Sequence, residues 1–248
     1  MNILTINNLS KTYHSLKDEI KAIKNINLII KDKEIVSIVG PSGCGKSTLL
    51  SILANLENKS SGTISLNKNK KIGYMLQTDS LFSWRTVLDN CLLPLEINNI
   101  KNKENIKKVN ELLKKYDLDN FKDMYPITLS GGMRQRVALI RTLATNPDLL
   151  LLDEPYSALD YQTRLIMNDD LYKIIKNEGK TVILITHDIG EAISISDRII
   201  VLTKRPAEVK SEYIINLEKK DIPSINRKDK KFNYYYDLIW RDIDEFRT

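Results

Sequence analysis

The feature that most constrains this chain is a glycine-rich loop between an apolar run and a helical pattern. The run Ile35–Val39 predicts a buried strand, and residues 49–54 predict a helix. The loop between them reads Gly40-Pro41-Ser42-Gly43-Cys44-Gly45-Lys46-Ser47-Thr48, which matches G-x-x-x-x-G-K-[ST]. Backbone N–H groups of such a loop point at one anion, and the following helix adds the positive end of its dipole. We therefore predict a phosphate-binding loop rather than a simple glycine turn.

Two side chains at the end of this loop have distinct expected roles. Lys46 is a compact charge that reaches the β- and γ-phosphates of a nucleotide, and Ser47 offers a hydroxyl to Mg²⁺. Both roles require a nucleoside triphosphate, so the loop predicts nucleotide binding.

A pair of acids follows another apolar run. Leu149–Leu152 predicts a strand buried on both faces, and Asp153 and Glu154 come directly after it. Open α/β sheets bind ligands at the carboxyl ends of their strands. We expect Asp153 to lie near Mg²⁺ and Glu154 near a water molecule, in preference to two solvated acids that merely open a loop.

Two further strands end in polar side chains. Residues 71–76 predict a strand that stops at Gln77, and Thr181–Ile185 predicts a buried strand shortly before His187. Gln77 is either a neutral oxygen ligand for a metal or water, or an ordinary surface residue. We expect His187 to contact a terminal phosphate, because its strand ends at the same sheet edge as Glu154.

A second helix start with glycines lies at residues 129–136. Ser130 is followed by Gly131 and Gly132, which is typical of either a second anion site or ordinary helix capping. Residues 85–136 carry helical patterns and no strand signal, so we interpret them as a helical subdomain inserted into an α/β core.

The remaining segments complete this pattern. A helix is expected at residues 162–176, and strands are expected at residues 2–7, 26–30, 63–66, 199–203 and 212–216. Residues 219–231 are charged and are expected to be mobile. Apolar residues recur at helical spacing over 232–246, which predicts an amphipathic helix docked on the protein's own core.

Composition sets the class of the chain. It has 248 residues, of which 42% are hydrophobic and 28% charged, and this balance is typical of a globular protein of one or two domains. No apolar run approaches the roughly 18 residues of a membrane span, and no secretion signal is evident, so we expect a cytosolic protein unless it docks on a membrane partner. The net charge of +6 indicates a solvated lysine surface rather than a surface for nucleic acid or for an anionic membrane. Cys44 and Cys91 are not expected to form a disulfide.

These motifs, in this order, resemble the ATP-binding subunits of ABC transporters over roughly residues 1–215. The matching segments are the Walker A loop at 40–48, the Q-loop at Gln77, the signature at 129–135, the Walker B strand at 149–154, the D-loop at 157–160 and the switch histidine at His187. Tyr13 falls where the family keeps an aromatic residue that stacks on adenine. Met133 replaces the usual glutamine of the signature.

The resemblance implies a fold and a domain organisation. The fold is a P-loop NTPase core, with a RecA-like mixed sheet, an antiparallel β subdomain and an inserted α-helical subdomain. The chain is a single ATPase domain over residues 1–248, with the helical subdomain at 85–136 and a short C-terminal extension at 217–248.

The resemblance also implies the site residues and the cofactors, ATP and Mg²⁺. Glu154, His187 and Lys46 are the expected catalytic residues, and the expected Mg²⁺ ligands are Ser47, Gln77 and Asp153. The expected nucleotide contacts are Tyr13, Gly40, Pro41, Ser42, Gly43, Cys44, Gly45, Lys46, Ser47, Thr48, Gln77, Ser130, Gly131, Gly132, Gln135 and Asp160.

Further segments resemble the nitrate, sulfonate and taurine importer ATPases. They are residues 76–90, 186–193 and 197–202, followed by Arg205-Pro206, with departures at Ser83, Ser157 and Gly190. This branch implies an ATPase that powers import of a small anion, a related solute or a vitamin precursor at the cytoplasmic face of the membrane. Its implied partners are a second, head-to-tail copy, a permease at Gln77 and residues 82–86, and indirectly an extracytoplasmic binding protein.

Other classes stay open at this point. A membrane-associated or soluble ABC ATPase with a role in regulation, DNA repair or translation is the main alternative. A stand-alone P-loop kinase is another, but it leaves the signature at 129–135 without a role.

Overall fold

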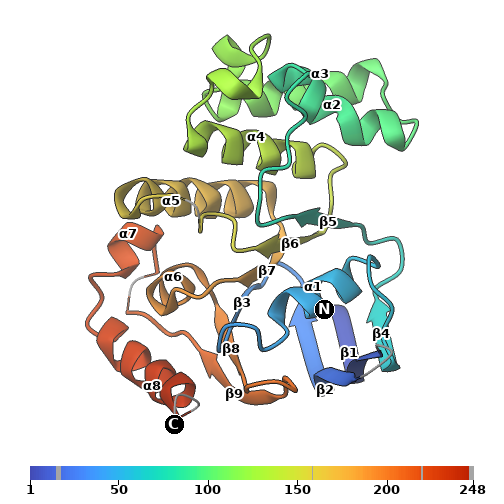
Figure 1. The fold of residues 1–248 in the computed structure, drawn as a ribbon. Helices are drawn as coiled ribbons and strands as arrows, with labels where there is room; N and C mark the ends of the chain where they lie inside the picture. The colour runs from blue at the N-terminus through green and yellow to red at the C-terminus, as the bar shows by residue number, and fades with distance from the viewer. Residues whose placement is uncertain (15–17, 158, 219, 246–248) are drawn as a thin grey trace.

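The computed structural model describes residues 1–14, 18–157, 159–218 and 220–245. Ala158, Lys219 and residues 246–248, which fall within the loop and tail predictions, lie outside this part of the chain. The described residues form two sheets, a set of helices packed on them, and a separate helical layer (Figure 1).

The larger sheet carries the segments predicted to hold the site. Its strand order is β5-β6-β7-β3-β8-β9, and all neighbours pair in parallel except β8 and β9. The strands are β3 Ile35–Val39, β5 Ile72–Met75, β6 Leu149–Asp153, β7 Thr181–Ile185, β8 Arg198–Leu202 and β9 Val209–Ile214. Strands β3, β6 and β7 are buried along their whole length, as their apolar sequences predict.

The smaller sheet is antiparallel, with the order β2-β1-β4. Its strands are β1 Asn2–His14, β2 Glu19–Lys31 and β4 Ser61–Leu66. The first two are much longer than the strands expected at 2–7 and 26–30, because they pair from Asn2↔Lys31 to His14↔Glu19 through several register shifts. Cross-strand hydrogen bonding extends β structure into polar residues that show no strand pattern of their own.

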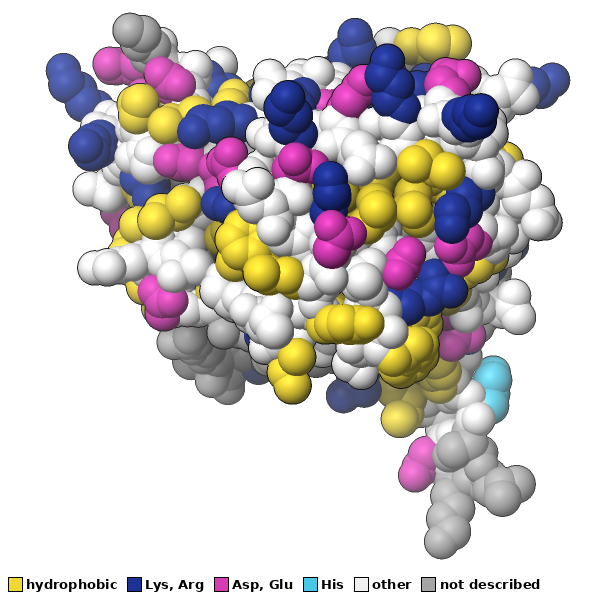
Figure 2. Space-filling model, turned by 90° about the horizontal axis from the view of Figure 1, so that it is seen from above, with side chains coloured by type: hydrophobic (Ala, Val, Ile, Leu, Met, Phe, Trp, Pro, Cys, Tyr) yellow, Lys and Arg dark blue, Asp and Glu magenta, His cyan; other side chains and the backbone are white. Residues whose placement is uncertain are grey.

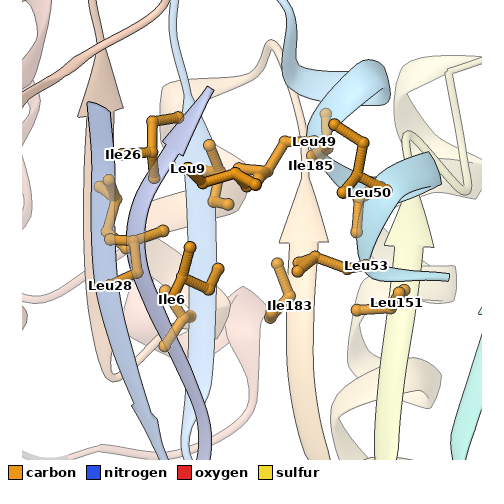
Figure 3. Packing of buried hydrophobic residues seen from close by; sticks show 14 of the residues in the cluster. Ile6, Leu9, Ile26, Leu28, Leu49, Leu50, Leu53, Leu151, Ile183 and Ile185 are labelled. Carbon is orange, nitrogen blue, oxygen red and sulfur yellow. The ribbon is translucent and has the colours of Figure 1, made fainter. Parts of the chain in front are cut away.

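The main hydrophobic core fills the space between the two sheets. Helix α1 Lys46–Leu53, directly after the glycine-rich loop, contributes Leu49, Leu50 and Leu53. They form one cluster with side chains of the small sheet, such as Leu9, and of β6 and β7, such as Ile183 (Figure 3). Burial of these aliphatic groups fixes α1, and with it the glycine-rich loop, against the sheet edge.

Helices α2 Val87–Ile97, α3 Lys103–Lys115 and α4 Gly131–Leu143 form a layer apart from the small sheet (Figure 1). They enclose their own apolar cluster, and short 3₁₀ helices η1 Asp119–Phe121 and η2 Pro126–Thr128 connect α3 to α4. The first two helices begin with side-chain caps, because Thr86 accepts from the N–H of Asp89 and Asn102 accepts from that of Asn105.

Four more helices follow the helical layer along the chain. They are α5 Tyr161–Glu178, α6 Ile189–Ile195, α7 Pro223–Asn226 and α8 Phe232–Asp244. Ile239 of α8 is buried against α6, β3 and β8, which confirms that the tail helix docks on the core.

The prediction that residues 219–231 are mobile is wrong for the described residues 220–231, which make fixed contacts. Asn226 is 1% exposed, and its Nδ2 donates to Ser194 O at 2.7 Å. The amide and hydroxyl of Ser224 both donate to the Asp169 carboxylate of α5. Charge made this segment look like a tail, but a few buried polar contacts hold it in place.

No helix within the described residues is long and apolar enough to cross a membrane. Viewed onto the helical layer, the surface carries basic and acidic side chains in close alternation, with hydrophobic patches between them (Figure 2).

Candidate functional site

The glycine-rich loop makes a tight turn between β3 and α1. Gly43 has φ +71° and Gly45 has φ +127°, values that L-residues rarely adopt. A Cβ added to Gly45 would lie 2.9 Å from Ala22 O. The tight turn leaves the backbone free to present its N–H groups to an anion, as the sequence predicts.

Lys46 turns back over this loop. It is 7% exposed, and its Nζ donates to Gly40 O at 2.9 Å and to Pro41 O at 3.0 Å. A buried ammonium held by two loop carbonyls lies directly at the glycine-rich turn. This geometry suits a charge that exchanges carbonyl contacts for phosphate oxygens.

Ser47 and Asp153 form the next part of the site. The Ser47 hydroxyl donates to Asp153 Oδ1 at 3.2 Å, and Tyr74 OH donates to Asp153 Oδ2 at 3.5 Å. Burial raises the pKa of Asp153, and the hydrogen bond from Ser47 offsets this only in part. A buried carboxylate of this kind is favoured by a nearby cation, so the pair fits Mg²⁺ chemically.

Few protein ligands surround this position. Across the described ranges, no three His, Cys, Asp or Glu side chains group together as a metal site. Mg²⁺ keeps several waters and takes phosphate oxygens together with one or two protein groups, so it does not require such a cluster.

Glu154, Gln77 and His187 meet at one carboxylate oxygen. Glu154 Oε2 lies 3.1 Å from His187 Nδ1 and 3.4 Å from Gln77 Nε2. The Gln77 amide also reaches Ser157 Oγ at 3.5 Å. Two polar groups predicted separately from the sequence, Gln77 and His187, therefore lie within hydrogen-bond distance of the Glu154 carboxylate.

The strand order explains this meeting. Gln77 follows β5, Glu154 follows β6 and His187 follows β7, and these three strands are neighbours in the sheet. The Glu154 backbone has φ +44°, and its N–H donates to Ile185 O at 2.9 Å. The strained turn aims the carboxylate along the sheet edge toward the histidine.

The signature segment lies elsewhere. Ser130 caps α4 and accepts from the Met133 N–H at 3.3 Å, and the glycines Gly131 and Gly132 form the first helical turn. Gln135 is only 5% exposed, and among the described residues its Oε1 has no hydrogen-bond partner. Helix α4 is on the helical layer, apart from α1 (Figure 1). The structure therefore does not bring these residues onto the chain's own phosphate loop.

Tyr13 and Asp160 occupy the margins of the site. Tyr13 lies near the end of β1, 36% exposed, with Lys11 Nζ 4.5 Å from its ring centroid. Asp160 caps α5 by accepting from the Thr163 N–H at 3.0 Å, and its contacts with Thr163 lower its pKa. Neither touches the Glu154 cluster through a contact that the structure shows.

Some neighbouring residues carry no signal in the sequence. Tyr74 contacts Asp153 from the interior of a strand, where an aromatic is ordinary. Lys204 and Arg205 line a hollow together with residues 41–44 of the phosphate loop. Arg205 belongs to a segment of the family resemblance, but nothing in its spacing indicates a role at the loop.

A buried polar group lies behind the switch histidine. Glu191 of α6 is 4% exposed, and it accepts a short hydrogen bond from the Thr186 hydroxyl, one residue before His187. Burial raises the pKa of Glu191, and the charge of Asp188 adds to this. Its Oε1 has no hydrogen-bond partner within the part of the chain that the structure describes.

We expect the stability of the protein to reflect this carboxyl. Because the folded pKa exceeds the ordinary value of 4.5, the protonated form favours folding below that pH, and this contribution is lost as pH rises toward the folded pKa. Glu191→Gln removes the titration, so its melting temperature should fall less than that of the wild type between pH 5 and 8. An equal change in melting temperature between pH 5 and pH 8 for the two proteins would contradict this prediction.

Comparison with known proteins assigns the class. The profile of the family described as "ABC transporter" matches residues 23–157. The chain is 40% identical over 251 residues to an uncharacterized ABC transporter ATP-binding protein, YtlC, of Bacillus subtilis, covering 98% of this chain and 96% of that protein. It is 38% identical to the taurine import ATP-binding protein TauB of Roseobacter denitrificans, covering 98% and 95%.

The fold is shared with a solved cassette. A dimeric structure of the ATP-binding cassette MJ0796 in a post-hydrolysis state, bound to ADP and Pi, matches with a TM-score of 0.74 and 36% identity. The match covers 86% of this chain and 99% of that one. The fold and the site thus define a P-loop ATPase of the ATP-binding cassette class. The chain belongs to the ABC transporter family, and the expected fold class is confirmed.

Proposed function

We propose that this chain binds MgATP and hydrolyses it as half of a head-to-tail dimer that powers an ABC importer. The observation that carries the proposal is the cluster at the sheet edge, where Glu154 contacts His187 and Gln77 beside the Ser47–Asp153 pair. Residues 1–248 act in this proposal as one ATPase domain, with the helical subdomain at 85–136 and the extension at 217–248.

The residues around the phosphate loop divide the chemistry between them. The loop Gly40–Thr48 binds the phosphates, and Lys46 neutralises charge that develops on them. Ser47, Asp153 and Gln77 hold Mg²⁺, which when bound further neutralises the phosphate oxygens.

Glu154 orients and polarises the attacking water. His187 Nδ1 lies 3.1 Å from Glu154 Oε2. In this proposal His187 contacts the γ-phosphate and holds the Glu154 carboxylate in position relative to that phosphate. Gln77 links this pair to the loop that follows β5, so that occupancy of the site is communicated outward.

The second copy completes the site. Ser130, Gly131 and Gly132 offer a hydroxyl and helix N-terminal amides to the nucleotide bound by the partner. Gln135 supports the helix behind them, Asp160 lies at the dimer seam, and Tyr13 stacks on the adenine held by its own chain. The support for a second copy is the placement of α4 away from α1, together with the dimeric state of the MJ0796 structure.

The permease contact is the loop between β5 and α2. Phe82 and Trp84 stack with ring centroids 4.8 Å apart, and Trp84 remains 71% exposed. The Asn90 side chain holds the Phe82 backbone through its N–H and C=O. A fixed loop that follows Gln77 and exposes a large aromatic suits a permanent partner surface, and the partner is a transmembrane permease.

The proposed solute class is taken from the names of the relatives. TauB carries taurine in its name, and others carry aliphatic sulfonates or nitrate. A small organic or inorganic anion, or a vitamin precursor, is therefore the proposed solute, delivered by an extracytoplasmic binding protein. The chain itself acts at the cytoplasmic face of the membrane and meets the solute only through the permease.

Trp84→Ala tests the permease surface. Loss of a central exposed aromatic from such a contact costs about 2 kcal/mol or more of binding, so co-purification with a multi-spanning permease from detergent extracts should fall at least tenfold. Ile214→Ala is the matched control, because Ile214 is also 71% exposed but lies on β9. Equal recovery of the permease with both variants would count against the surface, whereas recovery of no permease with the wild type would favour a non-transport ABC ATPase.

A further inference from the structure

The loop between β8 and β9 lies against the phosphate loop. The Ala207 N–H donates to Ala22 O at 2.9 Å, and Ala207 O accepts from the Lys24 N–H at 3.0 Å. A Cβ added to Gly45 would lie 3.6 Å from the Cβ of Ala207. Backbone hydrogen bonds to β2 therefore fix residues 203–208 next to the loop that binds phosphate.

The turn itself is well ordered by its own contacts. Thr203 Oγ1 accepts from the Glu208 N–H at 2.9 Å and lies 3.1 Å from Pro206 O. Glu208 also pairs with Lys24 Nζ at 2.8 Å. Residues 204–206, between these anchors, are held in place on the surface rather than left as a free tip.

Arg205 lines two hollows at this position. One, of about 320 Å³, is shared with Lys204 and residues 41–44 of the phosphate loop. The other, of about 550 Å³, is shared with residues 19–21 and Pro206. One side chain thus borders both the phosphate loop and the end of β2.

The second hollow lies on the side of Tyr13. Tyr13 and Ile20 are directly paired across β1 and β2, and directly paired residues of an antiparallel ladder project to the same face of the sheet. Ile20 borders the second hollow, so Tyr13, the proposed adenine contact, lies beside it. Arg205 therefore lies between the expected place of the base and the expected place of the phosphates.

Among the described residues, no side chain or backbone group of the fold pairs with the charge of Arg205. Within the described ranges its guanidinium makes no ion pair and no hydrogen bond. A guanidinium carries five donors and binds phosphate oxygens in a forked geometry. An unpaired arginine on a fixed loop beside a phosphate-binding turn suits a ligand contact better than a solvated surface position.

We propose that Arg205 is a nucleotide-binding residue that contacts the α-phosphate of ATP and ADP. It forms the wall of the site opposite the hydrolytic cluster, since β8 lies on the other side of β3 from β7. The proposal rests on the proposed function, because it needs a nucleotide at residues 40–48. It adds a contact that senses the presence of nucleotide without distinguishing ATP from ADP.

The test is calorimetric titration of the full chain with MgADP and, separately, with a non-hydrolysable Mg²⁺–ATP analogue. Removing one charge-assisted hydrogen bond costs about tenfold in affinity, so Arg205→Ala should bind both nucleotides about tenfold more weakly, by a similar factor. Lys68→Ala is the matched control: it removes a positive charge from an exposed residue of the turn between β4 and β5 and should bind as the wild type does. Arg205→Gln is a second variant, and melting of each protein without nucleotide checks the fold.

The outcomes separate the two levels of the proposal. Unchanged affinity in a folded Arg205→Ala or Arg205→Gln protein overturns the role of Arg205 and leaves the proposed function standing. Weaker binding of the ATP analogue alone also overturns it, because the contact would then be to the γ-phosphate. Failure of the wild type to bind either nucleotide is a failure of the proposed function itself.

Discussion

Lys46→Ala is expected to lower the affinity for ATP on the order of a hundredfold. Its ammonium is held at the phosphate loop by the carbonyls of Gly40 and Pro41, and it is the buried cation of that loop. Charge-assisted contacts to phosphate contribute about 1.5–3 kcal/mol each, and 1.4 kcal/mol is tenfold in affinity. Titration with a non-hydrolysable Mg²⁺–ATP analogue measures the loss directly.

Lys180→Ala provides the matched control for this result. Lys180 is similarly buried, at 9% exposed, and its Nζ donates to Asn146 Oδ1 at 2.7 Å. Both residues are far from the phosphate loop along the chain. It removes a buried ammonium without touching residues 40–48, so it should cost stability but not nucleotide affinity. An unchanged ATP titration for a folded Lys46→Ala protein would rule out the phosphate-loop interpretation.

The sheet edge was predictable because short apolar strands are defined by burial. Three short strands can bury all their apolar side chains only inside a sheet that is covered on both faces: Ile35–Val39, Leu149–Leu152 and Thr181–Ile185. Polar residues directly after such strands must then appear at one edge. The sequence thus placed Glu154 and His187 at the same edge, and the structure brings them within 3.1 Å of each other.

Contacts between separate elements could not be predicted in the same way. The length of the β1–β2 hairpin depends on cross-strand hydrogen bonds, and residues 8–14 carry no strand pattern of their own. The buried Asn226 looks like part of a charged tail until Ser194 supplies its partner. Arg205 approaches the phosphate loop only because Ala207 pairs with β2, a contact that spans most of the chain.

The signature segment illustrates the limit of a single chain. Ser130 and the two glycines after it begin a helix, and the structure shows them capping that helix on the layer of α2–α4. Their proposed role appears only when a second copy is added. Local pattern therefore predicts the element, whereas the role of the element depends on the assembly.

Glu154→Gln is expected to reduce ATP turnover on the order of a hundredfold to a thousandfold while ATP binding is retained. General-base assistance is typically a factor of 10²–10⁴, and the amide keeps the shape of the side chain but cannot accept a proton. Because the phosphate loop and the Ser47–Asp153 pair are untouched, the nucleotide should remain bound. The trapped nucleotide should then hold two copies together, and analytical ultracentrifugation with MgATP should show dimers.

Glu111→Gln is the matched control for this variant. It makes the same chemical change on α3, where the side chain is 63% exposed and pairs only loosely with Lys107 at 3.8 Å. It should hydrolyse ATP as the wild type does and should not accumulate dimers. If Glu154→Gln with MgATP remained monomeric while still binding nucleotide, the head-to-tail arrangement would lose its support. If it hydrolysed ATP at the wild-type rate, another group would have to activate the water.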